Sequence, residues 1–255
     1  MERRTFIEVI AGGLLAAPLA AEAQPVTQAE PSAVQDQYSA QRARMVSEIA
    51  ALARRTGSAT GRPSLSEAVM MAMGTIPRHR FVPGSHEIFA YRNQSLPIGE
   101  GQTISQPFLV ALMTDLLDPK PADIVLEVGT GSGYQAAVLA GLVARVYTIE
   151  IVEPLGRRAK QLLEELGYRN VEVRIGDGYN GWPEAAPFDS IVVTAAPSEI
   201  PQPLIDQLKL GGRMVIPAGG SSDLQHLLLV EKQVDGAVTI KRTLPVRFVP
   251  LTRDH

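Results

Sequence analysis

The chain of 255 residues contains no cysteine. This absence excludes disulfide bonds, thiolate nucleophiles and zinc sites built on cysteine. We expect no metal site on histidine either, because the four histidines, His79, His86, His226 and His255, show no ligand spacing. The chain also has no excess of positive charge. The net charge of −3 and the isoelectric point near 5.9 do not predict a basic surface, so nucleic acid is not an expected partner.

The apolar stretch near the N-terminus is too short to span a bilayer comfortably. It covers 13 residues, 9–21, and follows Arg3-Arg4. With an A-x-A cleavage pattern at Ala21-Glu22-Ala23, it resembles a twin-arginine export signal over residues 1–23, the alternative being a disordered or loosely helical tail. Residues 24–38, rich in Gln, Ala and Pro, predict a flexible linker. We expect no stable membrane insertion.

The rest of the chain has the composition of one ordinary globular domain, with 45% hydrophobic and 20% charged residues. We divide it into N-terminal helices with a polar loop, residues 39–118, and an α/β core, residues 119–255.

The N-terminal part contains two helix patterns. Apolar residues at helical spacing predict a helix over 39–56, stopped by Gly57. A capping box at Ser64-Leu65-Ser66-Glu67 predicts a second helix that runs to Gly74. The proline-bracketed residues 76–83 predict a surface connection.

A glycine-rich turn organises the core. Residues 124–128 predict a buried strand, and Gly129-Thr130-Gly131-Ser132-Gly133 predict a tight loop before a helix. Tyr134 replaces the last glycine of the dinucleotide fingerprint, and no lysine follows as in a P-loop. The carboxylate of Glu127 would repel a pyrophosphate but attract a cation, which favours S-adenosylmethionine (SAM). The alternative is a purely structural turn.

Two further acids follow strands at the spacing that a nucleotide site requires. Glu150 ends a β-rich run and is the predicted ligand of the ribose hydroxyls. Asp177, followed by Gly178, ends the next strand and is predicted to accept a hydrogen bond from the adenine amino group. Either acid alone would suit an ordinary solvated loop.

A polar segment precedes the predicted helix 108–117. Residues 96–107 place glycines, hydroxyls and amides in one loop, and Pro107 suits the first helical turn. Hydroxyl and amide groups beside free backbone N–H groups could hold a carboxylate. The alternative is that Ser105 or Gln106 only caps the helix.

Three segments together are similar to the protein-L-isoaspartate O-methyltransferase family. They are L-P-I-G-x-G-Q-T-I-S-Q-P at 96–107, V-L-E-V-G-T-G-S-G-Y at 125–134 and F-D-S-I-V-V-T-A-A-P at 188–197. The resemblance implies an α/β fold of the Rossmann-like, SAM-dependent methyltransferase type. Its sheet would be seven-stranded and mostly parallel with an antiparallel last strand, and helices would cover both faces.

The resemblance also implies an activity and a set of site residues. The activity is methyl transfer from SAM to the α-carboxylate of L-isoaspartyl residues, and of D-aspartyl residues as an extension, in damaged proteins. The methyl ester would then cyclise to a succinimide. The implied catalytic residues are Ser105, Thr103 and Gln102. The implied cofactor residues are Glu127, Gly129, Thr130, Gly131, Ser132, Gly133, Glu150, Asp177 and Gly178. The implied substrate residues are Ile104, Arg247, Phe248, Val249 and Pro250.

The C-terminal part predicts further strands. Residues 191–193 suit a buried strand, 201–210 a helix, and 213–219 another strand. Residues 224–230 and 238–249 predict a closing hairpin around Asp235-Gly236.

Other functions stay open from the residues alone. They are a SAM-dependent methyltransferase for another carboxylate or a small molecule, and a non-catalytic exported binding module. Tyr134 and the missing Tyr-x-x-x-Lys arrangement disfavour a NAD-dependent oxidoreductase. We expect a monomer in the cytoplasm, where SAM is made, with export to the periplasm as the alternative.

Overall fold

The computed structural model describes residues 37–219 and 224–253. The predicted export signal and nearly all of the predicted linker lie outside these residues. We assigned Tyr38 to the linker, but this residue packs against the folded domain. Its side chain is buried, donates a hydrogen bond to Glu87 Oε1 at 2.6 Å and stacks on the ring of His79.

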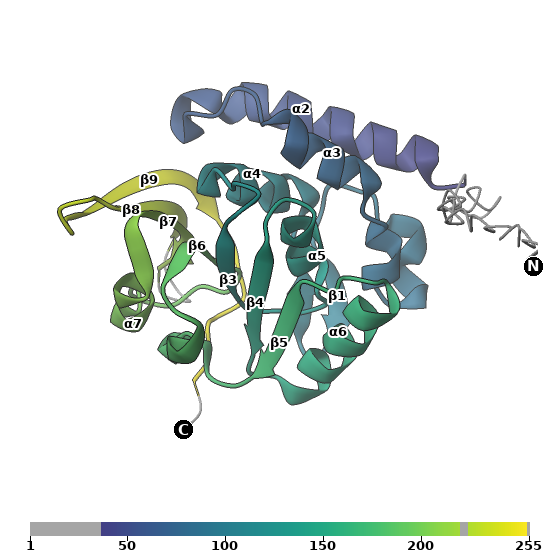
Figure 1. Cartoon of the computed structure of the whole chain (residues 1–255). Helices are drawn as coiled ribbons and strands as arrows, with labels where there is room; N and C mark the ends of the chain where they lie inside the picture. The colour runs from purple at the N-terminus through teal and green to yellow at the C-terminus, as the bar shows by residue number, and fades with distance from the viewer. Residues whose placement is uncertain (1–36, 220–223, 254–255) are drawn as a thin grey trace, which may run out of the picture.

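A seven-stranded sheet forms the centre of the molecule, which confirms the predicted fold class (Figure 1). Its order is β5-β4-β3-β6-β7-β8-β9, and β3 to β7 are parallel. β8 runs antiparallel to β7, and the last strand β9 runs antiparallel to β8. The strands are β3 (Ile124–Val128), β4 (Arg145–Glu150), β5 (Val171–Ile175), β6 (Phe188–Val193), β7 (Leu208–Ala218), β8 (Gln225–Lys232) and β9 (Val238–Val246).

The strand order reverses at β3. The chain adds β4 and β5 on one side of β3 and then returns to place β6 on the other side. In doubly wound sheets, the carboxyl ends of the strands at such a reversal border a crevice that binds ligands.

Alternating side chains of the sheet contribute to two cores. Val125 of β3 belongs to the core that also contains buried residues of the helices α2 to α6, whereas Leu126 and Val128 belong to a core on the opposite face with Trp182 and α7. This period of two follows from the pleat of a strand that is buried on both faces. The helices are α2 (Ser39–Thr60), α3 (Glu67–Thr75), α4 (Pro107–Leu117), α5 (Tyr134–Ala140), α6 (Glu153–Glu165) and α7 (Gln202–Asp206). Figure 1 shows α2 and α3 as a further layer outside α4.

The first two helices differ from their predicted bounds. α2 continues through Gly57 to Thr60, and Gly61 ends it in the left-handed region at φ 73°. Gly57 instead permits a close approach, since an added Cβ would lie 2.6 Å from the Cα of Pro63. The N-cap of α3 is Ser66 rather than Ser64, because the Ser66 hydroxyl accepts a hydrogen bond from the backbone N–H of Val69.

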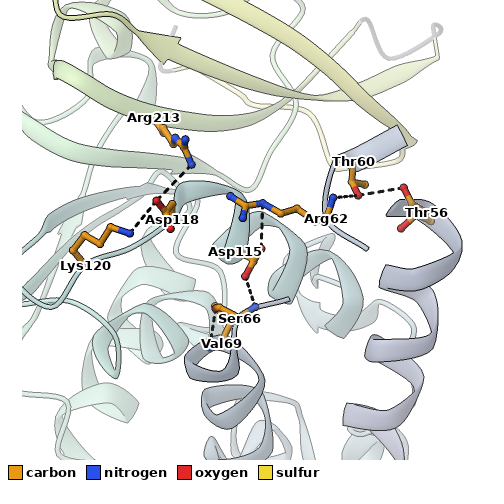
Figure 2. Close-up of polar contacts among 9 residues, drawn as sticks. All are labelled: Thr56, Thr60, Arg62, Ser66, Val69, Asp115, Asp118, Lys120 and Arg213. Atoms are coloured by element: carbon orange, nitrogen blue, oxygen red, sulfur yellow. Dashed lines mark hydrogen bonds and ion pairs between the residues drawn. The ribbon is translucent and has the colours of Figure 1, made fainter. Parts of the chain in front are cut away.

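A buried carboxylate joins α3 to α4 (Figure 2). Asp115 Oδ1 accepts a hydrogen bond from the Ser66 backbone N–H at 2.7 Å, and Oδ2 lies 3.3 Å from Arg62 Nε. Beyond the end of α4, Asp118 pairs with Lys120 at 2.9 Å and with Arg213 of β7 at 3.8 Å. These contacts attach the outer helices to the sheet at the end of α4.

Residues 76–83 are not a surface connection as predicted. They include the short 3-10 helix η1 (Arg78–Phe81), in which Arg78 and Phe81 are buried. A second 3-10 helix, η2 (Gly84–Phe89), follows. Residue patterns within the segment could not show that Arg78 and Phe81 pack against Tyr134, the first residue of α5.

The polar loop 96–107 contains a small hairpin. β1 (Leu96–Gly99) pairs with β2 (Gln102–Ile104), and the turn places Glu100 at φ 53° and Gly101 at φ 69°. Alternate residues Leu96 and Ile98 are buried, which holds the hairpin against the core. Gln102 and Thr103 therefore lie on a strand rather than on a free loop.

The last elements also differ from prediction. The helix expected over 201–210 covers only Gln202–Asp206, and β7 already begins at Leu208. The Lys232 ammonium donates hydrogen bonds to the Ile205 and Leu208 carbonyls at 2.9 and 2.8 Å, which stabilises this early helix end. β9 ends at Val246 instead of residue 249. None of the helices in the described ranges is both long and apolar enough for a membrane span.

Candidate active site

A cleft opens above the carboxyl ends of β3, β4 and β6. It contains about 550 Å³ of atom-free space, which includes the open mouth of the cleft. The predicted cofactor residues that border it are Gly129, Gly131, Glu150 and Gly178. The predicted catalytic residues Gln102 and Thr103 border it as well.

The glycine loop turns sharply at the end of β3. Gly129, Gly131 and Gly133 have φ values of 98°, 53° and 88°, a region that side chains disfavour. Gly129 has a second reason to lack a side chain, because an added Cβ would lie 2.5 Å from Thr194 Oγ1. The Thr194 hydroxyl donates a hydrogen bond to the Gly129 carbonyl at 2.6 Å, so β6 holds the loop in place.

Glu150 joins the end of β4 to the same loop. Its Oε2 accepts a hydrogen bond from the Gly131 backbone N–H at 2.7 Å, and Oε1 accepts one from Val152 at 2.9 Å. A carboxylate has about four acceptor positions, so both oxygens can still accept from ribose hydroxyls. This position suits the predicted role.

Glu127 lies beneath the loop and does not border the cleft. The Thr148 hydroxyl donates to Glu127 Oε2 at 2.7 Å, and Thr130 pairs with Thr148 at 2.7 Å. Burial raises the pKa of Glu127 to about 8, with a smaller opposing effect of the Thr148 hydrogen bond. Glu127 is therefore mostly protonated at neutral pH and supports the loop from below. Its direct contact with a cofactor stays a prediction.

The remaining predicted cofactor residues lie outside the border of the cleft. Asp177 begins the 3-10 helix η3 (Gly178–Asn180), where it accepts a hydrogen bond from the Tyr179 backbone N–H and lies 3.6 Å from Arg253 Nε. Gly133 starts α5 against Leu163. The others are Thr130, which is buried, and Ser132, which borders a separate cavity beside α6.

A second groove adjoins the first and has about 1250 Å³ of atom-free space. Ser105, Arg247 and Phe248 border it, and their roles at a substrate stay predictions. Three residues border both cavities: Thr103, Thr194 and Val249. Pro250 borders only the first cavity. The side chain of Ile104 is buried and borders neither.

Asn93 takes over the capping role that we considered for Ser105 and Gln106. The Phe108 backbone N–H donates to Asn93 Oδ1 at 3.0 Å, and Gln106 Nε2 donates to the Asn93 carbonyl at 3.0 Å. Gln106, the N-cap of α4, makes no side-chain cap. The Ser105 hydroxyl is thus not needed to cap the start of α4.

The segment 247–251 forms a wall between the two cavities. It runs beside the end of β6, where the Ala196 backbone N–H donates to the Val249 carbonyl at 2.8 Å and Leu251 donates to the Ala196 carbonyl at 2.9 Å. The side-chain amide of Gln225 accepts a hydrogen bond from the Phe248 backbone N–H and donates one to its carbonyl.

The family model described as protein-L-isoaspartate(D-aspartate) O-methyltransferase (PCMT) matches residues 59–255. The chain belongs to this family. It is 59% identical over 224 residues to protein-L-isoaspartate O-methyltransferase 1 of Cupriavidus necator, covering 88% of this chain and 86% of the relative. It is 62% identical over 208 residues to protein-L-isoaspartate O-methyltransferase 2 of Polaromonas sp. strain JS666, and this match covers 82% of this chain and 99% of the relative.

Solved structures agree with this PCMT assignment. A structure named protein-L-isoaspartate O-methyltransferase has a TM-score of 0.72 and 30% identity, and the match covers 82% of this chain and 65% of that one. A candidate PCMT of Plasmodium falciparum, solved in complex with S-adenosyl-L-homocysteine, has a TM-score of 0.68 at 24% identity. The match covers 81% of this chain and 98% of that one. The latter likeness shows the fold alone.

The PCMT cleft fits the SAM that enzymes of this family use. The glycine loop carries no lysine or arginine, and the acid at the border of the cleft is Glu150. A sulfonium cofactor without phosphate needs no cation there. Across residues 37–219 and 224–253, no three His, Cys, Asp or Glu side chains form a group that could hold a metal ion.

Sequence reasoning missed Thr194, which borders both cavities, and two residues that hold segments of the cavity walls, Asn93 and Gln225. Thr194 follows β6 directly, so its place at a strand end was an available signal. Asn93 and Gln225 act through contacts with residues 15 and 23 positions away, and no local pattern indicates such contacts.

Proposed function

We propose that this chain transfers the methyl group of SAM to the α-carboxylate of L-isoaspartyl residues, and of D-aspartyl residues, in damaged proteins. The resulting ester cyclises to a succinimide, whose hydrolysis restores some normal aspartate. One observation carries the proposal: the cofactor cleft and the substrate groove meet at Thr103, Thr194 and Val249.

The chemistry requires orientation more than acid–base catalysis. An α-carboxylate has a pKa of about 3.5, so it is ionised at neutral pH and needs no general base. SAM, when bound, supplies an activated methyl group. The protein must align the carboxylate oxygen and exclude water. We assign alignment to the Ser105 hydroxyl, with Thr103 and Gln102 beside it, and the peptide to residues 247–250.

The decisive experiment incubates the purified chain with labelled SAM and matched peptides that contain L-isoaspartyl, D-aspartyl or L-aspartyl at one position. We expect label in the first, weaker label in the second and none in the third. Label in other carboxylates or in small molecules only would favour a different methyltransferase. Absence of SAM binding in calorimetry would favour a binding module.

Replacing Ser105 by alanine should lower kcat/KM for the isoaspartyl peptide by about 10- to 100-fold, because an orienting hydrogen bond to a charged group is lost. The affinity for SAM should change little, since Ser105 does not border the cofactor cleft. Ser85→Ala, at an exposed serine of η2, is the control. Full activity of Ser105→Ala would remove Ser105 from the mechanism.

We further propose that the chain acts as a monomer in the cytoplasm. The supply of SAM supports the cytoplasm, because SAM is made in the cytosol. Sedimentation tests the first statement. Cell fractionation tests the second, and a shortened form in the periplasm would support the twin-arginine alternative.

A further inference from the structure

Arg78 is a fully buried arginine behind the substrate groove. Its exposed fraction is 0%, and it borders neither the cofactor cleft nor the groove. Nε donates a hydrogen bond to the Ala90 carbonyl at 2.8 Å, and Nη2 donates one to the Ser105 carbonyl at 2.7 Å. One guanidinium thus holds the backbone of the residue that carries the proposed active-site hydroxyl.

The same guanidinium reaches the glycine loop through an aromatic ring. Its central carbon lies 4.7 Å from the ring centroid of Tyr134, the first residue of α5 after Gly133. Phe81, three residues after Arg78, packs edge-on against the same ring at 5.5 Å. Arg78 therefore connects the turn at Ser105 with the helix that follows the cofactor loop.

Stability alone does not explain this residue. In the described part of the chain no carboxylate pairs with Arg78, and its Nη1 is buried without a hydrogen-bond partner. A buried charge without a counter-charge costs free energy, and apolar side chains at such positions are often neutral or stabilising. Arg78 donates to the two carbonyls from two different nitrogens of one planar group while the face of that group lies over the Tyr134 ring, and the compact ammonium of a lysine does not reproduce this fixed arrangement.

We propose that Arg78 is a positioning residue for methyl transfer, which sets the place of Ser105 relative to the glycine loop. This inference rests on the proposed function. Arg78 acts through Ser105, so the loss of kcat/KM caused by an Arg78 variant should depend on the Ser105 hydroxyl.

The experiment is a double-mutant cycle of Arg78→Lys and Ser105→Ala, measured with an isoaspartyl peptide and SAM. Arg78→Lys should lower kcat/KM by about 10- to 100-fold, mainly through kcat, because small misplacements of reacting groups are costly. Its dissociation constant for SAM should change by less than about threefold, because lysine keeps a cation over the Tyr134 ring. In the Ser105→Ala background, adding Arg78→Lys should lower kcat/KM by a further factor of less than about two. The effects of residues that act as a unit are not additive.

Arg80→Lys is the matched control, because Arg80 lies in the same 3-10 helix and is exposed. Thermal unfolding by circular dichroism reports the folded state of each variant, and Arg78→Gln replaces the lysine variant in the cycle if that variant does not fold. Full kcat/KM in Arg78→Lys, losses that multiply across the cycle, or a loss of SAM affinity as large as the loss of activity would each overturn the proposal. A wild-type chain inactive on isoaspartyl peptides would instead overturn the proposed function.

Discussion

At the residue scale, two glutamates of neighbouring strands have different environments. Glu150 accepts hydrogen bonds from two backbone N–H groups and borders the cofactor cleft. Glu127 is fully buried, accepts one hydrogen bond from Thr148, and its Oε1 has no partner. A protonated carboxyl tolerates such a site better than a carboxylate does. One acid thus lies at the border of the cleft and the other lies buried beneath the glycine loop.

This difference predicts how stability depends on pH. Burial chiefly raises the pKa of Glu127 from 4.5 to about 8, the Thr148 hydroxyl opposes this and the charge of Glu150 adds to it. Between these two values the folded state holds a proton that the unfolded state has lost, so stability decreases as pH rises through this window.

Glu127→Gln, which cannot ionise, should remove this contribution. We expect Tm of the wild type to fall more between about pH 5 and pH 9 than Tm of the variant. Glu164→Gln, at an exposed position of α6, should behave as the wild type does. Parallel Tm curves for wild type and Glu127→Gln would show that Glu127 is ionised in the folded protein.

At the element scale, the end of β9 decides the shape of the substrate groove. The chain leaves the sheet at Val246 and crosses to β6, where it pairs with Ala196. Gln225, at the start of β8, holds this crossing by two hydrogen bonds to the backbone of Phe248, at 2.6 and 3.2 Å. Without them the segment 247–249 would lose its attachment to β8.

Gln225→Ala should therefore raise KM for the isoaspartyl peptide. Two hydrogen bonds of about 1 kcal/mol each correspond to roughly 10- to 30-fold in the population of the binding-competent segment. Steady-state kinetics at saturating SAM measures the change. Gln233→Ala, on an exposed glutamine of the same hairpin, is the control. An unchanged KM would mean that the bridge to Ala196 alone holds the segment.

At the scale of the whole molecule, the described residues contain every group of the proposed mechanism. Both cavities are lined by residues between Leu52 and Thr252. The domain division proposed from sequence therefore has a direct test in truncated chains.

A chain that starts at Gln37 should keep the Tm and the kcat/KM of the full chain. One that starts at Ser39 should unfold at a lower temperature, by about 4 °C or more, because it loses a buried aromatic residue. That residue, Tyr38, stacks on His79 at 4.1 Å and donates to Glu87 at 2.6 Å. Equal Tm values for the two truncated chains would contradict this account of Tyr38.

Much of the fold and part of the site follow from local patterns. The strand before Gly129, the glycine turn and the acid at Glu150 are properties of short segments, because strand alternation and backbone conformation depend mainly on neighbouring residues. The sequence by itself determined the parallel α/β core, the family, and the end of the sheet at which the cleft lies, above the carboxyl ends of the parallel strands.

Only the tertiary structure decided which polar side chains are buried and which segments are fixed by hydrogen bonds from distant residues. The position of Arg78 behind Ser105, the raised pKa of Glu127 and the Asn93 cap of α4 each depend on contacts between distant segments. The early start of β7 and the end of β9 do as well. A hydrogen bond across the fold leaves no periodicity in the sequence, since its partners are brought together only when the layers pack.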